Sequence, residues 1–175
     1  KYFIRLDPDD YFNENAFLVM ANYLEKNKKV SMVFPDYFYV DKSSNILNVD
    51  TRKKIGKETK ALDLPAHGAC TMFRTSELRN LHGYSTKFKA QDGYDIWYKM
   101  FENFTIHNIS TPLFYYRQHS LSLSRQENKI LSERQKIKRH YASSKSKNLK
   151  TLFVIGAKNK NQGLRNPILR KLNGT

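Results

Sequence analysis

The chain has 175 residues, enough for one ordinary domain with a buried core or for one domain and the start of another. Hydrophobic residues make up 39% of it and aromatic residues 13%, which excludes a disordered chain although 27% of the residues are charged. The net charge of +15 favours anionic partners such as nucleic acid, an anionic membrane surface or phosphorylated substrates, and does not choose among them.

The expected environment of the chain follows from its single cysteine and from its apolar patterning. Cys70 cannot form an internal disulfide and has no cluster of Cys or His ligands around it, which indicates a reducing compartment. No run of about 18 apolar residues occurs, so we expect a cytoplasmic chain without a membrane span or export signal. The chain starts directly in a strand pattern, and we expect it to be cut from a longer protein.

Apolar periodicity and turn residues predict strands that alternate with helices in the first half of the chain. A strand at residues 1–6 passes into an acidic turn at 7–10, and helical spacing follows over 16–24 with Asn13 as a possible cap. The remaining elements of this half are expected to be strands at 30–34 and 37–40, a turn at 41–45, a surface loop at 50–60, a strand entered at 67–73, and a helix capped by Ser76 that ends at His82 and Gly83.

The second half combines an amphipathic helix, a strand and a basic helix. Apolar residues at 96, 97, 100 and 101 predict a helix whose core face includes Ile96 and Trp97. Residues 105–116 read as a strand interrupted by Pro112, and residues 125–141 as a basic helix. The Ser/Lys-rich segment 142–149 reads as a linker before a new strand at 152–155.

The acidic turn, with the sequence RLDPDD at residues 5–10, is the most specific candidate site. Alternating carboxylates at the end of a strand can hold a divalent cation, Mg²⁺ or Mn²⁺, between themselves and a diphosphate. We expect Asp7 and Asp9 to lie within reach of one metal ion. The alternative is an Asx-rich turn or helix cap, which would explain Asp10 and Asp9 but not three acids around a proline.

Two further segments carry polar side chains suited to chemistry. In the sequence QDGYD, residues 91–95, a carboxylate could accept a proton from an attacking hydroxyl, or the acids could simply meet the positive end of a helix. In YRQHSLSLS, residues 116–124, Arg117 and His119 could contact phosphate oxygens or a metal, although a lone histidine is more often structural.

In this order, the strand with DPDD, then QDGYDIW, then YRQHSLSLS resemble family 2 glycosyltransferases, which are inverting enzymes of the GT-A fold. The likeness covers about residues 1–125. It implies an α/β fold with a mixed sheet flanked by helices, whose N-terminal nucleotide-binding half would lie before residue 1. It also implies a first domain over residues 1–141.

The resemblance assigns roles to the acidic residues. Asp9 matches the direct metal ligand, Asp7 a second ligand nearer the nucleotide, and Asp10 a third candidate. Asp92 matches the catalytic base. This sequence has one residue more than the commoner EDYDLW form, which leaves Asp95 as a competing base.

The resemblance also places the remaining contacts. His119, with Arg117 beside it, would belong to a loop that closes over the diphosphate and the metal. His67, Gly68 and Ala69 resemble a segment that lines the acceptor pocket. The implied reaction transfers a sugar, most often from a UDP-sugar, to a glycan, lipid-linked or protein acceptor, as in polysaccharide biosynthesis for the cell envelope.

Residues 150–175 resemble the opening of sugar cytidylyltransferases, in which the loop after the first strand surrounds a triphosphate. This implies that a second, nucleotide-activating domain begins there. The other possibility is an ordinary basic strand and loop.

Two other functional classes stay open. The charge and the aromatic residues Tyr37, Phe38 and Tyr39 would suit a nucleic-acid-binding module, but the carboxylate clusters would repel phosphates, so we expect no nucleic acid partner. The basic segment 125–150 would suit docking to an anionic membrane at its inner face, which is compatible with the enzyme. The sequence predicts no oligomeric state.

Overall fold

The computed structural model describes residues 1–51, 67–88, 91–118 and 127–143 of the chain. These residues form a mixed α/β structure with one six-stranded sheet, ordered β1-β5-β3-β6-β2, with β4 also paired to β3. Strands β3 and β6 run parallel, and the other pairs are antiparallel. The strands are β1 Tyr2–Ile4, β2 Tyr11–Phe12, β3 Val30–Val40, β4 Ile46–Asp50, β5 Met72–Arg74 and β6 Thr105–Arg117.

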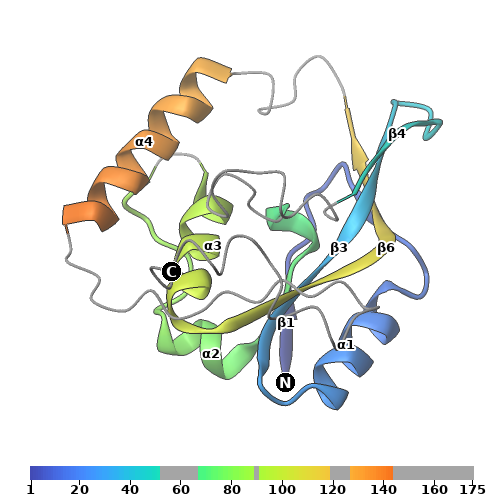
Figure 1. The fold of residues 1–175 in the computed structure, drawn as a ribbon. Coiled ribbons are helices and arrows are strands. Elements are labelled where there is room, and N and C mark those ends of the chain that lie inside the picture. Colours follow the sequence, from blue (N-terminus) through green and yellow to red (C-terminus); the bar gives the residue numbers. More distant parts are fainter. Residues whose placement is uncertain (52–66, 89–90, 119–126, 144–175) are drawn as a thin grey trace, which may run out of the picture.

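Helices cover both faces of this sheet, with α1 on the side opposite to α2 and α3 (Figure 1). Neighbouring residues of β3 point to opposite faces, so Met32 and Phe34 pack with α3 while Val33 packs with α1. The helices are α1 Ala16–Lys26, α2 Thr75–Asn80, α3 Asp92–Asn103 and α4 Glu127–Ser143, and a short 3₁₀ turn, η3, spans Gly68–Cys70.

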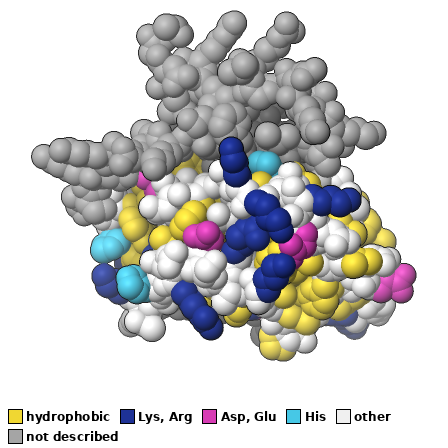
Figure 2. All heavy atoms as spheres, turned by 90° about the horizontal axis from the view of Figure 1, so that it is seen from below, with side chains coloured by type: hydrophobic (Ala, Val, Ile, Leu, Met, Phe, Trp, Pro, Cys, Tyr) yellow, Lys and Arg dark blue, Asp and Glu magenta, His cyan; other side chains and the backbone are white. Residues whose placement is uncertain are grey.

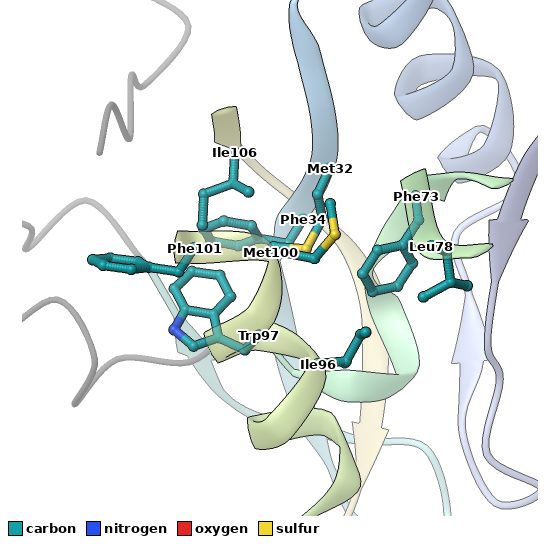
Figure 3. Close-up of a cluster of buried hydrophobic side chains, with 9 residues drawn as sticks. All are labelled: Met32, Phe34, Phe73, Leu78, Ile96, Trp97, Met100, Phe101 and Ile106. Atoms are coloured by element: carbon teal, nitrogen blue, oxygen red, sulfur yellow. The ribbon is translucent and has the colours of Figure 1, made fainter. Parts of the chain in front are cut away.

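The larger core lies between α3 and the sheet. Ile96 and Trp97 are 2% and 3% exposed, as the helical spacing predicts, and the Trp97 ring meets Phe34 edge-on at 5.3 Å. Figure 3 shows these side chains converging from α3, α2 and the strands. Each large side chain buried here contributes about 2 kcal/mol to folding. A smaller cluster contains Cys70, whose side chain is fully buried.

The two strands predicted at residues 30–34 and 37–40 are one continuous strand, β3. Its register against β6 shifts around Pro35 and Asp36, and Asp36 pairs with Pro112. Both prolines thus lie at one irregularity, where a missing N–H donor breaks no regular ladder. The Asn108 amide fills the gap by donating to the Phe34 carbonyl and the Asp36 carboxylate, both at 3.2 Å.

Two predicted helix caps are corrected, and one strand was not predicted. The N-cap of α1 is Asn15, while Asn13 lies before the helix and accepts the Asn15 N–H through Oδ1. Arg74, rather than Ser76, occupies the N-cap of α2. Strand β4, Ile46–Asp50, was not predicted, because its apolar residues are exposed to solvent and burial does not alternate along the strand.

The end of α2 and the basic helix agree with the sequence. His82 and Gly83 both adopt positive φ angles, 58° and 65°, and the Gly83 N–H bonds back to the Leu78 carbonyl, which ends the helix. The basic helix is α4. Most of the predicted linker and all of residues 150–175 lie outside the described residues, as does most of the predicted loop 50–60.

Within the described ranges, no helix combines the length and apolarity needed to cross a membrane. The face in Figure 2 mixes Lys and Arg side chains with acidic and hydrophobic ones.

Candidate active site

The acidic turn and the start of α3 are joined by one arginine. Arg5 follows β1, and its Nη1 lies 2.7 Å from Asp92 Oδ2 while its Nε lies 3.1 Å from Asp7 Oδ1. The Asp7 and Asp92 side chains are 38% and 45% exposed. Arg5 therefore brings the two carboxylates to one side of the sheet and leaves both open to solvent.

Close backbone packing supports this bridge. A Cβ atom on Gly68 would lie 3.2 Å from the Arg5 Nη2, and one on Gly93 would lie 3.2 Å from the Gly68 Cα. Gly93 is the extra residue between the two acids of the QDGYD segment. Two residues without side chains thus let η3, the Arg5 side chain and α3 meet at the Asp92 end of the site.

The charge of Arg5 is stabilised by its surroundings. Burial disfavours the charged form, but Asp7 and Asp92 outweigh burial and raise the pKa of Arg5. The guanidinium carbon lies 5.5 Å from the centre of the Tyr84 ring. Burial raises the pKa of Tyr84 to about 12, so its hydroxyl stays neutral beside the ion pairs.

The side chain of Asp10, at the end of the same turn, is buried and hydrogen-bonded to the backbone. It is 6% exposed, and its Oδ1 accepts the backbone N–H of Arg117 at 2.9 Å. Burial raises the pKa of Asp10 to about 7, although the Arg117 N–H bond acts in the opposite direction. These contacts fit the turn alternative for Asp10 better than a role as a third metal ligand.

The Arg117 side chain clamps the turn to the β3–β4 hairpin. Its Nε donates to the Asp9 carbonyl at 2.9 Å, its Nη1 to the carbonyls of Asp41 and Lys42 at 2.8 and 2.9 Å, and its Nη2 to Ser44 Oγ at 3.1 Å. Four of the five guanidinium donors are used in this way. The predicted nucleotide contact of Arg117 has no support in these bonds and stays a prediction.

Asp95 differs from Asp92 in its access to solvent, although both are paired with a cationic side chain. Its side chain is fully buried, 2.9 Å from Lys99 Nζ, and it accepts a hydrogen bond of 2.6 Å from the Tyr141 hydroxyl of α4. A carboxylate enclosed in this way is not open to an incoming hydroxyl. The geometry thus favours Asp92 over Asp95 as the base.

The predicted acceptor segment lies beside the Asp92 end of the site. His67 begins η3, and its ring packs among Tyr37, Phe114 and Tyr116, at 4.4 Å from Tyr116 between ring centres. Gly68 contacts the residue after Asp92, as described above. Ala69 is fully buried, and its predicted contact with an acceptor stays a prediction.

The metal assignment rests on the chemistry of Asp7 and Asp9. Mg²⁺ and Mn²⁺ suit carboxylate oxygens and commonly use one or two of them together with substrate phosphates and water. Among the described residues, no group of three His, Cys, Asp or Glu side chains could hold a metal. His119, the other predicted ligand, lies outside the described residues.

Sequence reasoning missed Arg5 and the α4 residues that reach α3. Arg5 stands two residues before Asp7 in an otherwise apolar strand pattern, and a charged residue there was an available signal. Its contact with Asp92 spans 87 residues of chain and could not be read from local spacing. Tyr141 and Asp95 are likewise joined only by the fold.

No family model matches the chain, and no curated protein matches it. Two solved structures of S. aureus TarS, a GT-A glycosyltransferase, resemble it. The TarS 1–349 structure matches with a TM-score of 0.50 and 13% identity over 86% of this chain and 50% of that one. The structure in complex with UDP gives a TM-score of 0.50 and 12% identity over 83% and 48%.

The chain spans about half the length of the TarS structures that it matches. At 12–13% identity the likeness concerns the fold. The mixed sheet with α1 on one face and α2 and α3 on the other therefore resembles part of a GT-A glycosyltransferase fold.

Proposed function

We propose that the chain is part of a glycosyltransferase that moves a sugar from a nucleotide-sugar to an acceptor hydroxyl with inversion. The observation that carries the proposal is the Arg5 bridge, which joins the Asp7 turn to Asp92 on one open face. The similarity to the UDP complex of TarS supports a nucleotide ligand.

Asp92 is the group suited to activate the acceptor. Its partly exposed carboxylate can take the proton of an acceptor hydroxyl as that oxygen bonds to the anomeric carbon. The bond from the anomeric carbon to the diphosphate breaks in the same displacement, and the leaving oxygen keeps the electron pair. One displacement from the opposite face inverts the anomeric configuration.

Asp7 and Asp9 are suited to the leaving-group end. A Mg²⁺ or Mn²⁺ ion bound there would neutralise the charge that develops on the diphosphate. Arg5 holds Asp7 and Asp92 in a fixed relation, so the residues for the two ends of the reaction keep their spacing. The acceptor, a glycan, a lipid-linked chain or a protein, would approach past His67 and Gly68.

The test is binding of UDP to the full-length protein with and without Mn²⁺, measured by titration calorimetry. We expect Asp9→Asn to abolish the manganese-dependent part of binding, because it removes a charged ligand of the metal. Glu14→Gln, which neutralises an exposed carboxylate close by in the chain, is the matched control and should leave binding unchanged.

Two results would count against the proposal. Unchanged manganese-dependent binding in Asp9→Asn would remove the metal assignment. A wild-type protein that binds no UDP at any metal concentration would overturn the nucleotide-sugar function itself.

A further inference from the structure

Helix α4 lies beside the first turns of α3 (Figure 1). Arg134, Ile137 and Tyr141 follow one another at spacings of three and four residues, so they share one face of α4. Ile137 is fully buried on this face, and Arg134 and Tyr141 are half-buried. This face is the part of α4 that contacts α3.

Arg134 holds the residue that precedes the candidate base. Its Nε donates to Gln91 Oε1 at 2.9 Å, and its guanidinium carbon lies 5.3 Å from the centre of the Tyr94 ring. Gln91 has a left-handed backbone, with φ 63° and ψ 33°, which is unfavourable for a residue with a side chain. An outside contact is therefore needed to keep Gln91 in this conformation.

The conformation of Gln91 decides how α3 begins. The Gln91 carbonyl accepts the N–H groups of Tyr94 and Asp95, at 2.9 and 3.1 Å, and so closes the first turn. Asp92 is the first helical residue after Gln91. A change at Gln91 would consequently move the Asp92 carboxylate relative to Arg5.

Tyr141 holds the same turn from its buried side. Its hydroxyl donates to Asp95 Oδ1 at 2.6 Å, and its ring stacks on Tyr98 at 4.3 Å between centres. The stacking and the hydrogen bond fix α4 to two successive turns of α3. Arg134 therefore holds the residue before α3, and Tyr141 holds the first turn of the helix.

We propose that α4 is a positioning element for the candidate base: Arg134 fixes Gln91, and Tyr141 fixes Asp95, so that Asp92 faces Arg5 and the acceptor. The proposal rests on the proposed function. Arg134 and Tyr141 are positioning residues, since they act through Gln91 and Asp95 and do not contact a substrate.

The first experiment measures amide hydrogen exchange in the full-length protein and needs no activity. Arg134→Gln should speed exchange at the Tyr94 and Asp95 amides by about tenfold, because their acceptor carbonyl is no longer held. Arg139→Gln, on the exposed side of the same helix, removes an equal charge and should change neither amide. Equal exchange in the two variants would overturn the proposal.

The second experiment measures hydrolysis of UDP-glucose and UDP-N-acetylglucosamine, with water in place of the acceptor. Arg134→Gln should lower kcat by about tenfold with little change in KM, and Tyr141→Phe, which keeps the stacked ring, should lower it less. In an Asp92→Asn background, Arg134→Gln should have no further effect, because its action passes through Asp92.

The double variant separates positioning from general stability. If Arg134→Gln lowers kcat by the same factor with and without Asp92, the residue has only a structural role and the proposal is wrong. If the wild-type protein hydrolyses neither donor and binds no UDP, the proposed function fails, while the exchange measurement still decides whether α4 fixes the start of α3.

Discussion

The acidic turn and the start of α3 each contain a pair of aspartates three residues apart, Asp7 with Asp10 and Asp92 with Asp95, and in both pairs the two members have opposite surroundings. Asp9 lies between the members of the first pair. Asp7 and Asp92 are 38% and 45% exposed and share Arg5. Asp10 and Asp95 are 6% and 0% exposed and are held by groups distant in the chain, the Arg117 N–H and the Tyr141 hydroxyl.

The comparison indicates a division of labour within each pair. The exposed member is open to ligands and can change partners at low cost, because water replaces the lost contacts. The buried member anchors its segment, because a buried carboxylate must keep its hydrogen bonds. In each pair the first aspartate is thus suited to chemistry and the second to structure.

The largest expected effect concerns the exposed member of the α3 pair. Asp92→Asn in the full-length protein should cut sugar transfer by about 100-fold or more, the scale for loss of a general base, and leave donor affinity nearly unchanged. Steady-state kinetics with donor binding measured separately would test this. If Asp95→Asn shows that pattern and Asp92→Asn does not, the two roles are reversed.

The buried member of the same pair should act on stability. Asp95→Asn keeps an acceptor for Tyr141 but leaves Lys99, which is 18% exposed, without its anionic partner, and should lower the free energy of unfolding by about 2 kcal/mol. Asp92→Asn breaks a half-exposed ion pair and should cost less than about 1 kcal/mol. Equal costs in urea unfolding would contradict the division of labour.

The last expected effect is a pH dependence at Asp10. Burial raises its pKa from 3.8 to about 7, so between these values the folded state holds a proton that the unfolded state has lost. The contribution of Asp10 to stability must therefore fall as pH rises across this range. Asp10→Asn keeps the acceptor for the Arg117 N–H without the charge, and its advantage over the wild type should grow from about pH 4 to 7.

Asp41 provides a control of opposite sign. Hydrogen bonds from the Asn45 side chain and backbone lower the pKa of Asp41, so its contribution to stability is lost as pH falls. Asp41→Asn should therefore compare worse with the wild type as pH rises toward about 4, the ordinary pKa of an aspartate, and the difference should stay constant from about pH 4 to 7. Urea unfolding across the same pH range measures both variants, and parallel curves for the two would refute the Asp10 assignment.

The local sequence pattern predicted those elements in which the buried and the exposed side chains lie on separate faces. The apolar spacing at 96, 97, 100 and 101 identified α3 and its core face, because apolar residues at this spacing lie on one face of an amphipathic helix. The β4 strand was missed since Ile46 and Leu47 are 56% and 57% exposed, and only pairing with β3 makes this segment a strand. Its formation depends on a partner strand and not on its own pattern.

The candidate site was predictable in its residue types and not in its connections. The motifs singled out the aspartates of both segments, but identical side chains give no sign of which of them is buried. That depends on where Arg117 and Tyr141 arrive, 107 and 46 residues away in the chain. The difference in burial between Asp92 and Asp95 therefore needed the fold, and which of the two acts as the base stays a prediction.

The burial of Cys70 has a practical consequence for following these segments. It is the single cysteine of the sequence and is fully buried, so a thiol-reactive dye would not reach it in the folded chain. A cysteine introduced at exposed Ser132 of α4 would then be labelled selectively. A fluorophore there would report, in real time, whether α4 changes its surroundings when a nucleotide is added.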